Sequence, residues 1–226
     1  NWATNASSES TNTEDGLLSN DSYTGVWYPW GTTTDLAGNN VFVPPSHMVL
    51  RTLALNDQVA FPWFAPAGIR RGVVDNATSV GYIKASTGEK QVIAVSSGIR
   101  DTLQSNRVNP ITFLTGAGLT VYGQKTRHSG TSSLDRVNVA RLVIYLRTQL
   151  DKLAQPFIFE PNDELTRNEI KGAVESLLLE VQGQRGLYDF AVVCDDTNNT
   201  PTRIDRNELY VDIAIEPVKA VEFIYI

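Results

Sequence analysis

Two groups of residues in this sequence are of types that could carry out catalysis. Cys194 could act as a nucleophile, with His128 as its base and Asp195 as the residue that orients the base. The acidic cluster near 160–164 could supply a pair of carboxylates for general acid and base catalysis. A hydrolase is therefore one alternative function. Each group also has a structural interpretation, because Cys194 ends an apolar segment and Asp163 stands where it can cap a helix.

The sequence favours neither a metal site nor a cofactor site. Asp195, Asp196, Asn198 and Asn199 gather oxygen ligands as a calcium loop does, but the glycine and the later glutamate of the helix-loop-helix calcium motif are missing. The glycines within 116–123 lack the spacing of the dinucleotide-binding fingerprint. We therefore expect no catalytic residue, no cofactor and no metal ligand.

The composition is that of an ordinary globular protein and argues against two classes of partner. Of the 226 residues, 42% are hydrophobic and 19% are charged, and the net charge is −6. An acidic chain of this kind is not expected to bind nucleic acid or a membrane surface. Cys194 has no second cysteine with which to form an internal disulfide, which fits a reducing compartment.

Residues 1–21 differ in composition from the rest of the chain. They are mostly Ser, Thr, Asn and acidic residues, with few side chains to bury, and they predict a mobile loop or a cut edge. Residues 22–226 are expected to form a single core domain.

Helical and strand patterns are interleaved along the chain without a regular βα repeat, which predicts a mixed α+β fold. We expect a mixed β-sheet packed with about three to four helices. Apolar residues at helical spacing predict helices at about 46–56, 89–105, 133–153 and 163–183. Short apolar or alternating runs predict strands at 23–30, 111–114, 119–122, 157–162 (with a turn), 190–194, 209–216 and 221–226.

Segment 61–73 is unusual, because it is too apolar for an ordinary solvent-exposed loop and too rich in proline for a helix or a central strand. Its prolines restrict the backbone and its aromatic residues can anchor it, which would hold Arg70 and Arg71 at a defined place. Each guanidinium can bind a carboxylate through two parallel hydrogen bonds. We interpret the segment as a stiff interface element; the alternative is a packed crossover with two solvated arginines.

Six motifs, in order along most of the chain, resemble those of contractile tail sheath proteins. Tyr23–Trp30 is also similar to the "y.a.yyPw" segment of that family. The six are VPPS with WFAPAGIRRGV (43–46, 63–73; family "PPS … w.APAG..rG"), NRVNPITFLTGAGLTVYGQKT (106–126; "gvNpi..fpg.G..vwG.rT"), LDRVNVARLVIYL (134–146; "yvNvrRl"), FIFEPNDE (157–164; "fvFEPN"), VVCDDTNNT (192–200; "V.cd..nNt") and VDIAIEPVKAVEFIYI (211–226; "i.iaPv.paEFI").

This resemblance implies a tail-sheath C-terminal-type domain in a structural subunit that is not an enzyme. It also implies that residues 22–226 are the tail sheath core domain, a fragment of the C-terminal and inner part of a subunit whose outer domains and terminal arms are not included. Such a subunit polymerises as stacked hexameric rings around a tail tube and contracts to drive the tube through a target cell envelope. The implied partners are other sheath subunits, the tail tube protein, and the baseplate and tail terminator proteins. The implied location is the virion tail, assembled in the host cytoplasm. A tail-associated receptor-binding protein is a second alternative to the sheath, besides the hydrolase.

Two further sets of residues are candidate partner contacts. Arg167 and Lys171 lie four positions apart on the predicted helix 163–183, off its apolar face, and are expected to point outward toward the tube. A solvated helix face is equally consistent with this pattern. Val221, Phe223 and Tyr225 alternate along the last predicted strand, which is expected to join the 209–216 sheet and to offer an edge for an incoming strand.

Overall fold

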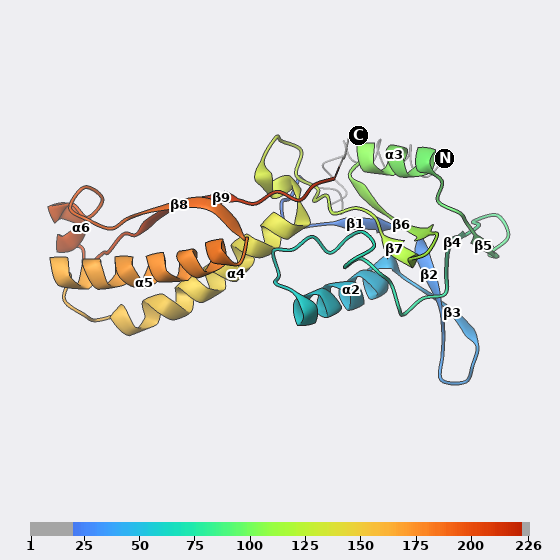
Figure 1. Cartoon of the computed structure of the whole chain (residues 1–226), viewed down its shortest axis with the longest axis horizontal. Coiled ribbons are helices and arrows are strands. Elements are labelled where there is room, and N and C mark those ends of the chain that lie inside the picture. Colours follow the sequence, from blue (N-terminus) through green and yellow to red (C-terminus); the bar gives the residue numbers. More distant parts are fainter. Residues whose placement is uncertain (1–19, 223–226) are drawn as a thin grey trace. The chain divides into compact units, whose positions relative to one another are not determined.

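The computed structural model describes residues 20–222, and these divide into two compact units with the boundary between residues 140 and 141 (Figure 1). Helices and strands are interleaved in both, so the predicted mixed α+β class is confirmed. The segment expected to be mobile, 1–21, lies almost entirely outside the described residues. Compact units can be parts of one domain, so a single core domain over 22–226 stays a prediction.

The first unit contains a 3-stranded sheet in the order β1-β6-β7 and a 4-stranded sheet in the order β3-β2-β4-β5. Strand β1 is parallel to β6, and the other neighbours are antiparallel. The elements of this unit are β1 (Val26–Tyr28), β2 (Trp30–Thr34), β3 (Asn40–Val43), α2 (Pro45–Val59), β4 (Ser79–Ile83), β5 (Lys90–Val92), α3 (Ser97–Ser105), β6 (Val108–Leu114), β7 (Gly118–Val121) and η1 (Ser133–Asp135).

The second unit combines helices with a 2-stranded antiparallel sheet, β8-β9. Helix α4 begins at the end of the first unit, and most of its length belongs to the second. The elements are α4 (Val137–Ala154), η2 (Gln155–Phe157), α5 (Glu164–Gly183), β8 (Leu187–Val193), α6 (Pro201–Asp205) and β9 (Asp212–Pro217).

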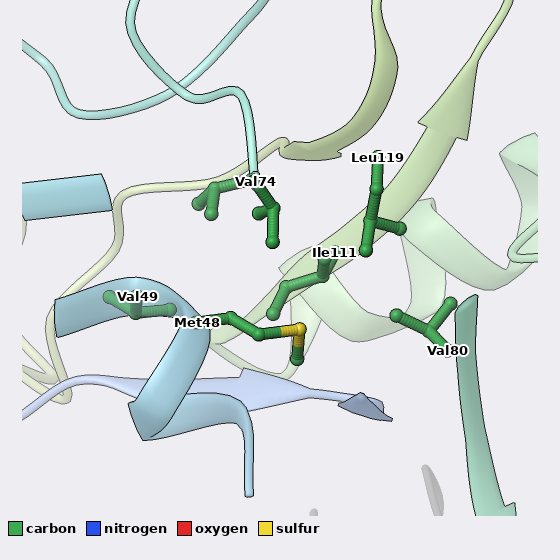
Figure 2. Close-up of a cluster of buried hydrophobic side chains, with 7 residues drawn as sticks. Met48, Val49, Val74, Val80, Ile111 and Leu119 are labelled. Atoms are coloured by element: carbon green, nitrogen blue, oxygen red, sulfur yellow. The ribbon is translucent and has the colours of Figure 1, made fainter. Parts of the chain in front are cut away.

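The core of the first unit is centred on Met48 of α2 and Ile111 of β6, which are both 0% exposed (Figure 2). Burying a side chain of this size stabilises the fold by about 1.5–3 kcal/mol. The cluster joins α2, the two larger sheets and the segment before β4, and its other members are Val49, Val74, Val80, Leu119 and Val121.

Asn109 is a fully buried polar residue that ties three segments of the first unit together. Its Nδ2 donates to the carbonyl oxygens of Val26 (3.1 Å) and Lys125 (2.8 Å). Its Oδ1 accepts from the backbone N–H of Lys125 at 2.6 Å. Because an unsatisfied buried amide is costly, this set of bonds explains an asparagine inside strand β6.

The buried apolar residues of the second unit come from α4, α5, β8 and the position directly after β8, and α5 packs on β8. Asp163 caps α5 as predicted, accepting from the backbone N–H of Thr166 at 2.9 Å. The buried apolar side chains of this unit are Leu142, Leu146, Ile170, Val174, Leu178, Val181, Leu187, Val192 and Cys194.

Three predicted elements differ from the structure. The strand predicted at 23–30 is divided at Pro29, because β1 pairs with β6 while β2 pairs with β3 and β4. The first part of the helix predicted at 89–105 is strand β5, whose pairing with β4 overrides the helical spacing of its apolar residues. The strand predicted at 157–162 is wrong. The chain there forms η2 and a turn, with Glu160 N–H donating to Phe157 O at 3.2 Å.

Candidate assembly interface

The aromatic residues of segment 61–73 pack on one another. The rings of Phe61 and Trp63 are stacked with centroids 4.9 Å apart, and Phe64 lies 6.2 Å from Phe61. Trp63 is buried, and its carbonyl oxygen accepts from Nδ2 of Asn138 at 3.3 Å. The segment is therefore an ordered part of the first unit.

Backbone hydrogen bonds join the end of this segment to strand β7. Gly68 N–H donates to Val121 O at 2.9 Å, and Val121 N–H donates to Gly72 O at 2.7 Å. A Cβ atom at Gly72 would lie 2.7 Å from both Gly68 N and Val121 O. Only glycine fits this close approach of backbones, which explains the glycine that follows the two arginines.

The two arginines of the segment have different environments. Arg71 lies with its guanidinium carbon 4.9 Å from the centre of the Phe64 ring, and its Nε donates to Ala65 O at 3.3 Å. Arg70 is exposed, and the neighbouring Ile69 is 64% exposed. Arg71 therefore stiffens the segment from within. Arg70 is the cation that the segment displays.

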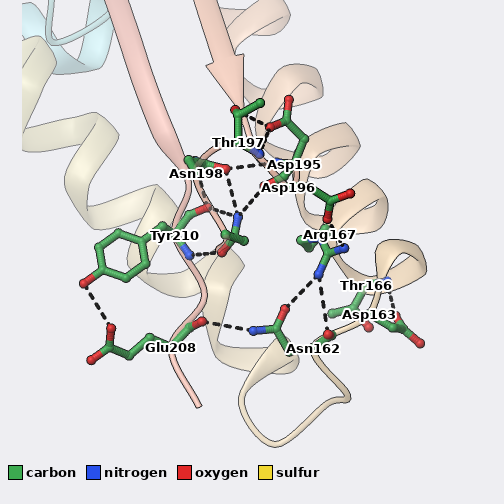
Figure 3. Close-up of polar contacts among 11 residues, drawn as sticks. Asn162, Asp163, Thr166, Arg167, Asp195, Asp196, Thr197, Asn198, Glu208 and Tyr210 are labelled. Carbon is green, nitrogen blue, oxygen red and sulfur yellow. Dashed lines mark hydrogen bonds and ion pairs between the residues drawn. The ribbon is translucent and has the colours of Figure 1, made fainter. Parts of the chain in front are cut away.

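Arg167 does not point outward, so this expectation was wrong. Its side chain is 9% exposed, and its Nη2 lies 2.8 Å from Oδ1 of Asp196. Its Nη1 donates to both Oδ1 (3.3 Å) and the backbone oxygen (3.5 Å) of Asn162 (Figure 3). The buried face of α5 includes Thr166 and Arg167, because tertiary partners satisfy the guanidinium there.

The loop between β8 and α6 is closed by two buried asparagines, Asn198 (Figure 3) and Asn199. Nδ2 of Asn198 donates to Val193 O (2.8 Å), Tyr210 O (3.2 Å) and Oδ2 of Asp212 (3.0 Å). Asn199 exchanges two bonds with the backbone of Tyr210, at 2.9 and 2.7 Å. These amides therefore fix the loop between the two strands of the small sheet.

The remaining predicted contacts are placed as follows. Lys171 is half-buried on α5. Val221 is 78% exposed and does not belong to a strand. Phe223 and Tyr225 lie outside the described residues, as does most of the strand predicted at 221–226. Partner binding by these residues, and by Arg70, Arg71 and Arg167, therefore stays a prediction.

The β8-β9 sheet has open edges in the part of the chain that the structure describes. Each strand pairs with one other strand only. Phe190 and Val192 of β8 stand opposite Ile215 and Ile213 of β9 on the more buried side. An open edge of this kind can pair with a further strand.

The groups considered for catalysis have environments that oppose it. Cys194 is buried, and burial raises the pKa of its thiol, whereas a nucleophilic cysteine needs a lowered pKa. The hydrogen bond from Thr166 N–H lowers the pKa of Asp163, whereas a general acid needs a raised one. His128 Nδ1 lies 3.1 Å from the hydroxyl of Ser22.

Neither a metal cluster nor a membrane span is found in the described region. Within residues 20–222, His, Cys, Asp and Glu side chains do not gather in threes or more as a metal ion requires. No helix in that same range is long and apolar enough to cross a bilayer.

One exposed feature was missed at the sequence level. The turn between η2 and α5 displays Ile158 and Phe159, and the first turn of α5 displays Leu165. These residues are 59%, 102% and 67% exposed, respectively. The FIFEPN stretch at 157–162 is the only local signal there, and its pattern predicts a short strand and turn. A φ of 76° at Phe159 is a tertiary detail that no local pattern predicts.

Comparison with known proteins identifies the class. Residues 129–226 match the phage tail sheath C-terminal domain family. The chain is 35% identical to the tail sheath protein of Vibrio phage KVP40 over 185 residues, which are 82% of this chain and 26% of that protein. It is 34% identical to the tail sheath protein of Enterobacteria phage T4, with the same coverage of 82% and 26%. The chain thus spans about a quarter of the length of these curated relatives.

A solved structure has the same fold. The contracted sheath complex of an extracellular contractile injection system, PVC, aligns with a TM-score of 0.82 and 21% identity, over 99% of this chain and 59% of that chain. The fold and the ordered motifs define a contractile sheath protein. The chain belongs to the phage tail sheath family, and its residues 129–226 match the C-terminal domain of that family.

Proposed function

We propose that this chain is part of the structural subunit of a contractile tail sheath. The subunit polymerises as stacked hexameric rings around a tail tube, and contraction drives the tube through a target cell envelope. The match of residues 129–226 to the sheath C-terminal domain carries this proposal. The fold shared with a contracted sheath complex supports it.

The subunit works as an assembly protein and not as an enzyme. Its neighbours in the polymer are other copies of the subunit, the tail tube protein, and the baseplate and tail terminator proteins. It acts in the virion tail, after assembly in the host cytoplasm. The raised pKa of Cys194 and the helix-capping role of Asp163 support a structural function over the hydrolase alternative.

Strand addition links the subunits. The open edges of β8-β9 support this mechanism, because an arm from a neighbouring copy can extend the sheet through main-chain hydrogen bonds. Residues Val221, Phe223 and Tyr225 belong to the segment that would supply or receive such a strand. Each hydrogen bond in such an addition contributes about 0.5–1.5 kcal/mol net.

Charged residues supply weaker contacts that can slide. Arg70 and Arg71 belong to an ordered segment at the subunit surface, where Arg70 can meet a carboxylate of a partner. On α5 we assign the tube contact to Lys171. Because it is buried against Asn162 and Asp196, Arg167 contributes to that contact only by holding the start of α5. Salt screens such exposed charge pairs.

Electron microscopy of the complete natural chain that carries this sequence tests the proposal. We expect sheath-like tubes whose repeat consists of stacked rings. Backbone hydrogen exchange adds a local measure, since assembly should increase protection in β8 or β9. Strand β6 is a matched control, because it is paired on both sides in the free protein and should change little. A chain that stays monodisperse with β8 and β9 unchanged would contradict the proposal.

A further inference from the structure

The turn before α5 and the first two residues of that helix form an exposed knob, which we define as residues 158–165. Ile158, Phe159 and Leu165 expose most or all of their side chains there. Glu160, Asp163 and Glu164 are exposed within the same segment. A protein rarely presents a fully exposed phenylalanine among other exposed apolar side chains unless a partner covers them.

The backbone of the knob supports the same conclusion. Phe159 has a φ of 76°, in the left-handed region that disfavours residues with a Cβ. Phe159 is 102% exposed, so no burial within its own unit offsets the cost of this backbone conformation. An unfavourable backbone that displays an apolar side chain indicates a contact made outside the chain described here.

The base of the knob is held in place by polar contacts. Asp163 caps α5, and Nδ2 of Asn162 donates to Glu208 O at 3.0 Å (Figure 3). Arg167 binds Asn162 and Asp196, as described above. Because the turn is ordered before any partner arrives, little conformational entropy is lost on docking.

Residues 61–71, the part of segment 61–73 that precedes Gly72 (here segment 61–71), have the complementary chemistry. This segment displays Ile69 and Phe61, which are 64% and 40% exposed, and Arg70, which follows Ile69 in the sequence, is exposed as well. It contains Arg70 and Arg71 and no acidic residue, whereas the knob contains Glu160, Asp163 and Glu164 and no basic residue. The two surfaces therefore match in both apolar character and charge.

We propose that the knob of one copy docks on segment 61–71 of a second copy of this chain. Phe159 and Ile158 contact Ile69 and Phe61, while Arg70 pairs with Glu160 or Glu164. Each copy carries one of each surface, so the contact is head-to-tail, and such contacts build rings or helical polymers. This inference rests on the proposed sheath function, and it names one contact within the polymer.

Disulfide trapping between two variants of the complete natural chain tests the contact directly. One variant carries Phe159→Cys and the other carries Ile69→Cys, and the two are mixed before assembly. We expect oxidation to give covalent dimers containing one of each variant, and only in the assembled state. Cys194 is 2% exposed and remains as it is in both variants. In the matched control, a Leu36→Cys variant takes the place of the Ile69→Cys variant. Leu36 is 110% exposed between β2 and β3, and this pair of variants should give no such dimer.

Charge exchange supplies an independent readout. Arg70→Glu and the pair Glu160→Arg with Glu164→Arg should each raise the critical concentration for assembly by about tenfold. Combining the two changes should bring it back toward the original value, because the ion pairs re-form with reversed sign. Additive losses without recovery would overturn the proposed contact.

The outcomes separate this inference from the function on which it rests. An unmodified chain that forms no polymer would overturn both. Polymers that form normally without the Phe159–Ile69 disulfide would overturn the inference and leave the sheath function standing. A disulfide within a single copy, or covalent capture of a tube-protein cysteine by Phe159→Cys alone, would also overturn it.

Discussion

Nη2 of Arg167 lies 2.8 Å from Oδ1 of Asp196, although the arginine side chain is 9% exposed and the aspartate side chain is 87% exposed. The pair thus joins a buried cation to a surface anion. The free energy of the contact therefore depends mainly on the arginine. Its desolvated guanidinium also donates a hydrogen bond to Oδ1 of Asn162.

We predict that Arg167→Ala lowers the free energy of unfolding by about 2–3 kcal/mol, because it leaves Asn162 without its buried donor. Asp196→Asn should cost less than about 1 kcal/mol, since water already solvates that carboxylate. Denaturant unfolding of the complete natural chain measures both. The matched control is Lys171→Ala, one turn further along α5, with a change of about 0.5 kcal/mol or less. Equal losses at positions 167 and 171 would contradict the assignment.

Asp163 makes the start of α5 sensitive to acid. The hydrogen bond from Thr166 N–H, with a smaller effect of the Arg167 charge, holds the pKa of Asp163 below its usual value. A lowered folded-state pKa stabilises the fold above the unfolded-state pKa, and this contribution is lost as the pH falls through the folded value. Asp163→Asn keeps a capping amide but does not titrate.

We therefore expect the difference in stability between the natural chain and Asp163→Asn to shrink as the pH is lowered from neutral to below about 4. Thermal unfolding midpoints at a series of pH values measure this. The control is Asp151→Asn, because Asp151 is exposed on α4. Asp212 is not used, because its carboxylate accepts a hydrogen bond from Asn198. Identical pH profiles for the natural chain and Asp163→Asn would argue against the cap.

Met48 is the central side chain of the first unit, and its loss should be costly. We predict that Met48→Ala lowers the free energy of unfolding by about 2–5 kcal/mol, from lost burial and the cavity left behind. Leu50→Ala is the matched control on the same helix, because Leu50 is 65% exposed, and its effect should be near about 0.5 kcal/mol. Chemical denaturation followed by tryptophan fluorescence distinguishes the two. Similar losses would mean that α2 is packed differently.

Gly72 is required by the close approach of segment 61–73 to β7. We predict that Gly72→Ala destabilises the fold by about 2 kcal/mol or more, because its Cβ would meet only backbone atoms, which cannot move aside cheaply. Gly98→Ala in α3 is the control, since a Cβ there meets nothing within 4 Å and alanine favours helix. The control variant should be neutral or more stable by about 0.5–1 kcal/mol. Proteolysis near residues 61–73 should increase in Gly72→Ala alone.

The sequence by itself determined the features that depend on neighbouring residues. The start of α5 could be predicted because Asp163 precedes a run at helical spacing, and capping is a contact over three residues. The β6-β7 hairpin follows from two apolar runs around glycines with φ of 85° and 78° at positions 116 and 118. The family could also be recognised from the sequence, because six short motifs occur along the chain in the same order as in tail sheath proteins.

Only the tertiary structure decided the features that depend on distant partners. The apolar spacing of residues 90–92 is compatible with a helix, but these residues form strand β5 because they pair with β4. Arg167 occupies a position that the helical pattern assigned to solvent, and it is buried because Asn162 and Asp196 meet its guanidinium there. A buried charge is stable only where such partners converge, and convergence is a property of the folded chain that periodicity along α5 does not encode.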